Sequence, residues 1–267
     1  EPRPETLRLI ADVQVVLDEY VGNLPLTVRQ VYYRLVGAHG RPKTEKFYNN
    51  VLLETVQKAR RAGRLSWAAF RDDSLTGGAP IAYANVPEFL RMLRIWTERF
   101  ERNKLADQPL HVEVWCESAG MVPQLQRVAA PYGVAVWSSS GFDSGTLRRE
   151  VALRLAQIGK PAYVLHLGDY DPSGAAIFTA FHEDVAAFLM ADAPDQAYRT
   201  AFRRVALTAD QVAIFGLPMA SPKPSSHAAR WRGEACQLEA LDPTTLAAIL
   251  DAEISELLDL DRLAETR

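Results

Sequence analysis

Acidic side chains follow two of the expected strands, at the point where each strand ends. Glu117 comes directly after an apolar segment at 110–116, and Asp169 and Asp171 come directly after a second one at 162–167. Open α/β sheets collect their functional groups at the carboxyl ends of the strands. Converging carboxylates repel one another unless a cation lies among them, and a set of oxygen ligands favours Mg²⁺ or Mn²⁺. We therefore expect a divalent metal site here, with an ordinary acidic surface loop as the alternative.

Four neighbours of these acids bear on the type of site. Gly168 and Gly174 carry no side chain, which would let a phosphate group approach the acids closely. Cys116 and His166 could bind zinc, but Cys116 should point to the opposite side of its strand from Glu117, and His166 lies within its strand. We expect both to pack in the core.

Tyr33 is a candidate nucleophile. A helix is expected to begin at Thr27, and Tyr32 falls on its apolar face, whereas Tyr33 falls off that face, one turn after Arg29. A guanidinium beside a phenol stabilises the phenolate and binds phosphate, which suits nucleophilic attack on a phosphodiester. The alternative interpretation is that Tyr33 packs at a contact between helices.

Two parts of the chain would position these residues. The first part reads as helical, with a short ribbon near 65–70, which is the outline of a winged helix or of a small helical bundle. The second part alternates strands with helices, which predicts βαβ units and a mostly parallel sheet in an α/β fold. We expect domains at 1–105 and 106–267, the second ending in an acidic helical tail. The expected helices of the first part cover 5–20, 27–36, 44–62 and 85–103, and the expected strands cover 110–116, 134–137, 162–167 and 202–207.

Charge is distributed unevenly along the 267 residues. The formal net charge is −3, which alone argues against a partner such as nucleic acid, yet residues 41–71 carry a net +6 and residues 233–267 a net −7. The basic segment could contact phosphates, or it could be a solvated surface. The candidate phosphate contacts are Lys46, Lys58, Arg60, Arg61 and Arg64, together with Lys223 and Arg230 in a Ser/Pro-rich loop.

Several classes of protein are not expected. No run of about 18 apolar residues predicts a membrane span, and the first residues do not read as a signal peptide. Two cysteines, Cys116 and Cys236, cannot form a disulfide framework, so a reducing, cytoplasmic setting is expected. The chain has no P-loop for ATP.

The acidic motifs resemble those of a Toprim domain, and in particular the Toprim domain of topoisomerase VI A subunits and of the meiotic double-strand-break transesterase. The matching segments are Glu117, Ser140-Gly141-Phe142-Asp143, Gly168 to Gly174, Val205 to Val212, Gly216-Leu217-Pro218 and Gln237 to Pro243. The segment before Asp143 departs from the Gly-Tyr-Pro-Asp form usual in that family. Arg29-Gln30-Val31-Tyr32-Tyr33 is similar to the Arg-x-x-Tyr-Tyr signature of the family's winged-helix domain.

This resemblance implies a Rossmann-like Toprim domain behind a winged helix, and a mechanism like that of a type IIB topoisomerase. Tyr33 would attack a phosphodiester of double-stranded DNA and form a 5′-phosphotyrosyl link, while Glu117, Asp169 and Asp171 would hold Mg²⁺. In the family, the Tyr of one protomer works with the metal site of the other, so a homodimer that cuts both strands is implied. Strand passage would need a separate ATPase subunit, and a prokaryotic protein of this kind would associate with the nucleoid.

Three other functions stay open. A hydrolytic Toprim nuclease would use a metal-activated water, with Tyr33 only binding or packing. A non-catalytic DNA-binding or assembly protein would bind DNA with strong salt dependence and cleave nothing. A sugar-nucleotide transferase would use the Asp-x-Asp pair with a metal, but would leave the basic segment without a role.

Overall fold

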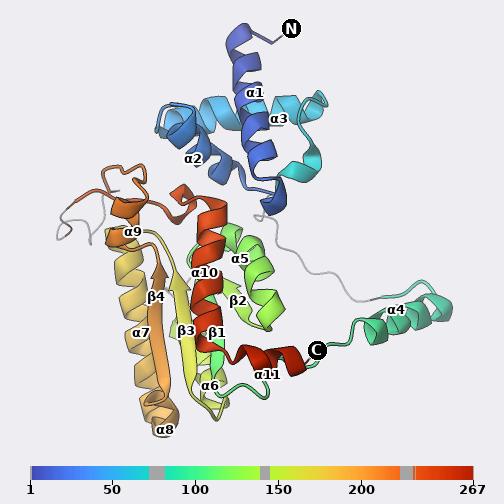
Figure 1. The fold of residues 1–267 in the computed structure, drawn as a ribbon, viewed down its shortest axis with the longest axis vertical. Coiled ribbons are helices and arrows are strands. Elements are labelled where there is room, and N and C mark those ends of the chain that lie inside the picture. The colour runs from blue at the N-terminus through green and yellow to red at the C-terminus, as the bar shows by residue number, and fades with distance from the viewer. Residues whose placement is uncertain (1, 72–81, 139–144, 223–230, 232, 267) are drawn as a thin grey trace.

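A four-stranded, all-parallel sheet forms the centre of the α/β part in a computed structural model of the chain (Figure 1). The structure describes residues 2–71, 82–138, 145–222, 231 and 233–266. The strand order is β2-β1-β3-β4, so β1 and β3 are neighbours at the centre. The predicted α/β class and parallel sheet are confirmed. The strands are β1 (His111–Cys116), β2 (Ala135–Ser138), β3 (Ala162–Leu167) and β4 (Thr200–Ala206).

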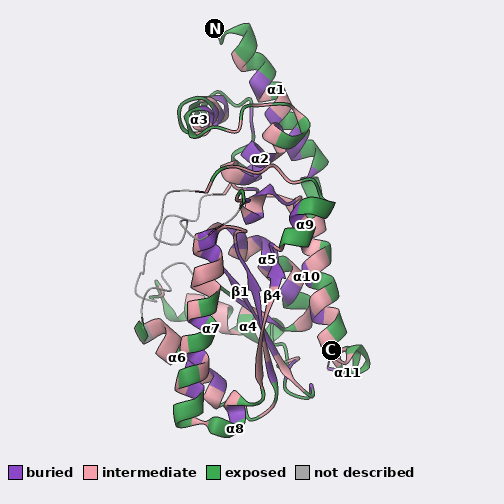
Figure 2. Cartoon of the chain, turned by 90° about the vertical axis from the view of Figure 1, so that its left-hand side faces the viewer, coloured by how far each residue is buried: buried purple, intermediate pink, exposed green. Residues whose placement is uncertain are grey.

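Helices cover both faces of this sheet. Alternate residues of β1 separate the two sides, because Val112 and Val114 belong to one buried cluster and Trp115 belongs to the other. Helices α5 (Val122–Ala129) and α10 (Pro243–Leu257) cover the first side, and α6 (Gly145–Ala156) and α7 (Pro172–Asp192) cover the second (Figure 2). Shorter helices are α8 (Pro194–Ala197), α9 (Ala209–Ile214) and α11 (Leu260–Glu265).

Two of these helices differ from what the sequence indicates. The expected acidic tail is not peripheral, since α10 packs on the sheet through its buried Leu246, Leu250 and Ile254. Two of its acids bond to neighbouring elements, since Glu253 pairs with Arg203 of β4 and Asp251 accepts from the Tyr132 hydroxyl. Helix α7 is long and apolar enough to cross a membrane by length and composition alone. Here α7 lies against the sheet and α6, and Phe181 and Val185 are fully buried.

The N-terminal part is a group of helices. These are α1 (Pro4–Glu19), α2 (Val28–Ala38), a π-helical segment (Phe47–Leu52) and α3 (Leu53–Arg61). The expected ribbon is a 3-10 turn at Trp67–Ala69, after which Phe70 forms an isolated bridge with Leu26. Residues 72–81 lie outside the described residues, so a wing stays a prediction. The expected helix at 85–103 is α4 (Val86–Glu98).

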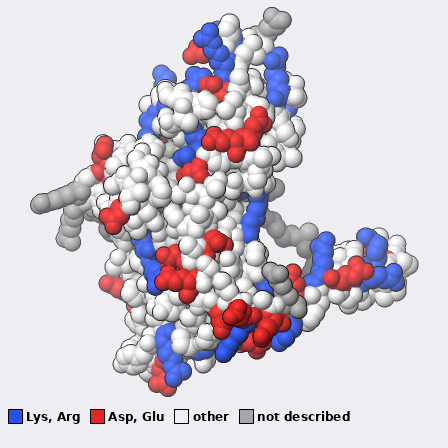
Figure 3. Space-filling model, in the orientation of Figure 1, with Lys and Arg blue, Asp and Glu red and all other residues white. Residues whose placement is uncertain are grey.

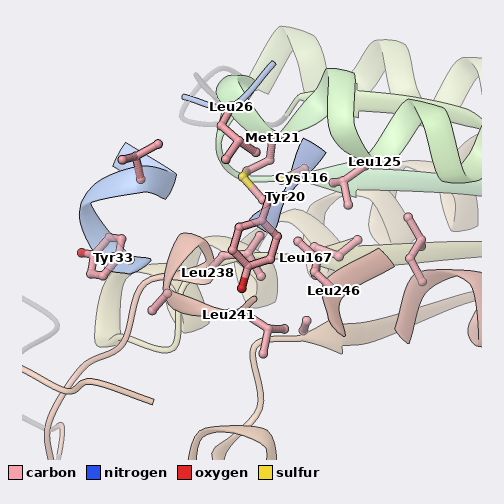
Figure 4. Packing of buried hydrophobic residues seen from close by; sticks show 14 of the residues in the cluster. Tyr20, Leu26, Tyr33, Cys116, Met121, Leu125, Leu167, Leu238, Leu241 and Leu246 are labelled. Carbon is pink, nitrogen blue, oxygen red and sulfur yellow. The ribbon is translucent and has the colours of Figure 1, made fainter. Parts of the chain in front are cut away.

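The N-terminal helices share a hydrophobic core with the sheet. One buried cluster runs from α1 and α2 through β1 and α5 to α10 (Figure 4). The expected boundary near residue 105 falls between α4 and β1, yet α1 to α3 are packed against the α/β part. This contact brings α2 to the carboxyl ends of β1 and β3. Labelled members of the cluster in Figure 4 include Tyr20, Leu26, Met121, Leu125, Leu238, Leu241 and Leu246.

Candidate active site

The ends of β1 and β3 bring the predicted acids together. Cys116 and Leu167 are paired at the last position of the two strands, so Glu117 and Asp169 follow at the same edge. The backbone N–H of Asp169 donates to Glu117 Oε2 at 3.1 Å. Asp171 is the N-cap of α7, and its Oδ1 accepts from the backbone N–H of Gly174 at 2.6 Å.

Two glycines make room for these carboxylates. A Cβ atom on Gly174 would lie 2.5 Å from the carbonyl oxygen of Asp169, 3.0 Å from Glu117 Oε2 and 3.3 Å from Asp171 Oδ1. A Cβ atom on Gly168 would lie 2.7 Å from Glu117 Oε2. Any larger residue at these positions would displace the acids, so the glycines keep the Glu117 and Asp171 oxygens on either side of one small space.

Burial and mutual repulsion raise the proton affinity of this acidic cluster. Burial, then the charges of Glu239, Glu117 and Asp171, raises the pKa of Asp169 to about 7, although Asp169 Oδ1 accepts from the backbone N–H of Leu238 at 2.9 Å. Burial also raises the pKa of Glu117 and that of Glu239. The cluster therefore holds more negative charge than its protein surroundings stabilise.

Glu239 is a fourth acid that the sequence analysis did not single out. It lies on the 3-10 turn Leu238–Ala240 and accepts a hydrogen bond from Ser118 Oγ at 3.3 Å. Two sequence signals pointed to it: the acidic C-terminal segment and the Gln237 to Pro243 match of the resemblance. Neither signal placed it next to Glu117.

The sequence analysis also did not single out Arg204, a residue of β4 that holds the loop carrying the acids. Its guanidinium donates to the carbonyl oxygens of Gly168 at 3.1 Å, of Gly174 at 3.3 Å and of Asp169. Burial lowers the pKa of Arg204. This cation thus fixes the loop that carries the acids through carbonyl groups.

Tyr33 is buried, which corrects the expectation that it lies off the packed face of its helix. It is 3% exposed, because α2 also packs against the 3-10 turn Leu238–Ala240. Its hydroxyl donates to Gln237 Oε1. Burial raises the pKa of Tyr33 above its ordinary value. Lys43 Nζ lies 5.9 Å from the centre of the Tyr33 ring.

Arg29, the other residue of the predicted pair, lies against a different ring, although its charge opposes the effect of burial on the pKa of Tyr33. Its guanidinium lies 3.9 Å from the centre of the Tyr48 ring and pairs with Glu45 at 3.2 Å. It lines a groove of about 730 Å³ between α3 and the segment after Glu117. That groove also contains Arg60 and reaches Glu239.

One cavity joins Tyr33 to the predicted metal ligands within a single chain. Its volume is about 430 Å³. The cavity is lined by, among others, Tyr33, Lys43, Glu117, Asp169, Asp171 and Gln237. A nucleophile candidate, a cation, the three predicted metal ligands and a fourth carboxylate, Glu45, therefore line the same space.

The donor set suits a hard divalent cation only in part. Within the described residues, no three His, Cys, Asp or Glu side chains are grouped as they would be around one ion. Glu117 Oε2 and Asp171 Oδ1 nevertheless lie 3.0 Å and 3.3 Å from the place that a Cβ of Gly174 would take, and Asp169 keeps one carboxylate oxygen that no described backbone group binds. Carboxylate oxygens carrying unneutralised charge are the donors that Mg²⁺ prefers.

Cys116 and His166 are core residues, as expected. Both are fully buried. The ring nitrogens of His166 have no hydrogen-bond partner among the described residues, and its ring lies 4.7 Å from that of Phe178. Burial, then the charge of Arg204, lowers the pKa of His166 to about 3. A neutral His166 packed in this way contributes nothing to the candidate site.

The basic candidates lie mostly on the N-terminal helices. Lys46, Arg61 and Arg64 are exposed, Lys58 pairs with Glu54, and Arg60 lies 4.1 Å above the centre of the Trp67 ring. Figure 3 shows Lys and Arg side chains around these helices and the largest acidic patch at the foot of the α/β part. Lys223, Arg230 and Asp143 lie outside the described residues.

Comparison with known proteins gives no relative. No protein-family model, no curated protein and no solved structure matches the chain. Function must therefore be argued from the site itself.

Proposed function

We propose that this protein is a Mg²⁺-dependent DNA-cleaving enzyme of the topoisomerase VI A type, in which Tyr33 attacks a phosphodiester. One observation carries the proposal: Tyr33 and the acids Glu117, Asp169 and Asp171 line the same cavity. Tyr33 lies on α2 in the N-terminal part, whereas the acids follow β1 and β3 in the α/β part, and α2 reaches the strand ends through a packed contact with the 3-10 turn at Leu238–Ala240. We also propose that α1 to α3 form a winged helix and that the parallel sheet has a Toprim-like arrangement.

The residues of the cavity would divide the chemistry. Glu117, Asp169 and Asp171 would hold Mg²⁺, which when bound offsets phosphate charge and assists the departing 3′ oxygen. The Tyr33 hydroxyl must leave Gln237 and lose its proton before it can attack. The charge of Arg29 favours the phenolate, and Lys43 lines the same cavity, so a phosphate drawn into it would meet both Tyr33 and Lys43.

DNA would approach along the basic side of the N-terminal helices. Lys58, Arg61 and Arg64 would contact phosphates without reading sequence. Arg60, held flat against Trp67, lines the groove that leads towards Glu239. The resemblance predicts a homodimer in which Tyr33 of one copy works with the acids of the other. The shared cavity also allows a single chain to supply both.

Hydrolysis is the second candidate. The state of Tyr33 favours it: Tyr33 is buried, its hydroxyl donates to Gln237, and burial raises its pKa. Each of these makes the phenolate harder to form. In this reaction a water would attack at the same acidic site, and Tyr33 would only pack against the 3-10 turn. The cut DNA would then carry free 5′ phosphates.

Plasmid cleavage tests the metal-dependent reaction shared by both candidates. Supercoiled plasmid should be cut in the presence of Mg²⁺ and left intact in a chelator. Asp169→Asn should abolish cutting, whereas Asp195→Asn, on the remote helix α8, should cut as wild type does. Cutting that survives in the chelator or in Asp169→Asn would overturn the proposal, and so would a purified wild-type protein that cuts no DNA with any divalent metal.

A further inference from the structure

Residues next to helix α4 set its start, yet α4 packs against no other helix or strand in the part of the chain that the structure describes. Asn85 Oδ1 accepts from the backbone N–H of Glu88 at 2.9 Å, and Glu88 Oε2 accepts from the backbone N–H of Ala84 at 2.6 Å. This reciprocal cap, with Pro87 in the first turn, sets the start of the helix. Figure 1 shows α4 standing away from the rest of the molecule.

None of the 13 residues of α4 is buried. Its large apolar side chains are instead open to solvent: Val86 is 68% exposed, Trp96 is 52% exposed, and Phe100, just after the helix, is 76% exposed. Isolated helices shorter than about 12 to 15 residues are marginal in water, because most helical stability in proteins comes from packing an apolar face. A helix with this composition requires a packing partner.

The apolar residues of α4 have the spacing of a helix-pairing surface. Val86, Phe89, Leu93, Trp96 and Phe100 follow one another at alternating intervals of three and four residues. This is the a/d pattern by which two helices pack side by side. We call these five residues the α4 stripe. The opposite face carries charges of both signs, in Arg91, Arg94 and Glu98.

We propose that the α4 stripe pairs with the α4 stripe of a second copy of this chain. Two copies packed antiparallel about a two-fold axis at Leu93 would place Val86 of one stripe opposite Phe100 of the other. Elsewhere in the described chain, the exposed large apolar residues are scattered from α1 to α11, so none of those elements presents a matching stripe.

The area available fits a concentration-dependent dimer. If all the exposed surface of the α4 stripe were covered in both copies, the interface would reach at most on the order of 1,000 Å², the lower limit for a specific interface. The inference is independent of the proposed cleavage activity, because it depends on α4 alone. The resemblance implies a homodimer but does not say which surfaces meet, and the α4 stripe is a surface that could do so.

Sedimentation of the full-length protein over a wide range of concentrations tests the pairing. Wild type should shift from the mass of one chain towards that of two. Leu93→Glu should weaken association at least about tenfold, whereas Arg91→Gln, an equal charge change on the opposite face, should not. At concentrations where wild type is monomeric, both variants should keep its thermal stability, since no residue of α4 is buried in the described part of the chain. A protein that stays monomeric throughout would overturn the proposal, as would a Leu93→Glu variant that associates like wild type.

Oxidative cross-linking gives a second, positive test. Cys116 and Cys236 are buried, so a cysteine introduced into α4 is the accessible thiol. With a mild thiol oxidant, Leu93→Cys should form a disulfide-linked dimer that a reductant dissolves, and Arg91→Cys should not. Cross-linking of Arg91→Cys in preference to Leu93→Cys would contradict the pairing. DNA cleavage by the same samples is read separately, so failure of the pairing and failure of the proposed activity are distinguishable.

Discussion

Replacing Asp169 with Asn should make the metal-free protein more stable and inactive at once. The pKa of Asp169 is raised from its ordinary value near 4 to about 7, first by burial and then by the charges of Glu239, Glu117 and Asp171. A carboxyl whose folded-state pKa is raised stabilises the fold while it is protonated. That stability is fully present below about pH 4 and is lost as the pH rises through about 7.

The magnitude follows from this pKa. At pH 8 the ionised Asp169 costs the folded state up to about 4 kcal/mol relative to an unshifted carboxyl. Asn is neutral and of nearly the same shape, and its carbonyl oxygen can still accept from the backbone N–H of Leu238. We therefore expect Asp169→Asn to gain between about 2 and 4 kcal/mol at pH 8, and this gain should fall towards zero near pH 4.

Urea unfolding in a chelator, followed across this pH range, measures the effect. Asp171→Asn is the matched control: it also removes one charge, but Asn remains a good N-cap for α7, so its stability should change by less than about 1 kcal/mol. The reasoning fails if Asp169→Asn is no more stable than wild type at pH 8, or if its advantage is the same at every pH.

Two further predictions concern the surroundings of the acids. Gly174→Ala should destabilise the protein by about 1 to 3 kcal/mol in thermal unfolding, because its Cβ would lie 2.5 Å from the Asp169 carbonyl oxygen, while Gly37→Ala, which meets nothing within 4 Å, should be neutral or stabilising. Equal effects of the two would contradict the close approach at Gly174. The pKa of His166 is lowered to about 3 in the folded protein, so below about pH 6.5 the imidazole takes up a proton only in the unfolded state. The free energy of unfolding should therefore fall as the pH falls below about 6.5. Between pH 7.5 and pH 5, wild type should lose about 2 kcal/mol more unfolding free energy than His166→Leu, and parallel pH profiles would refute this.

The sequence predicts the parts of this site that depend on strand ends. Glu117, Asp169 and Asp171 follow apolar segments directly, and parallel neighbouring strands must end at one edge, so their proximity follows from local pattern alone. The alternation of strands and helices likewise predicts the parallel sheet, because a helix that connects two strands returns the chain to the same end of the sheet.

The parts set by tertiary packing could not be predicted in this way. Helical periodicity assigns one apolar face to α2, but the turn at Leu238–Ala240 also packs against α2, so Tyr33 is buried. Arg204 lies within a strand, and only the path of β4 beside β3 brings its guanidinium under the acidic loop. The pattern of α4 predicts a helix correctly, but its lack of a partner is a property of the whole fold.

The chemical state of the cut 5′ ends tests the central claim most directly. Duplex DNA is labelled at the original 3′ end of each strand, incubated with protein and Mg²⁺ and then denatured. The label should migrate with the protein, because the fragment that carries it is joined to Tyr33 through its 5′ phosphate. Tyr33→Phe should give no adduct, while Tyr32→Phe, the adjacent buried tyrosine, should keep most of it. Free 5′ phosphates from wild type, or an undiminished adduct in Tyr33→Phe, would contradict the role of Tyr33 as the nucleophile.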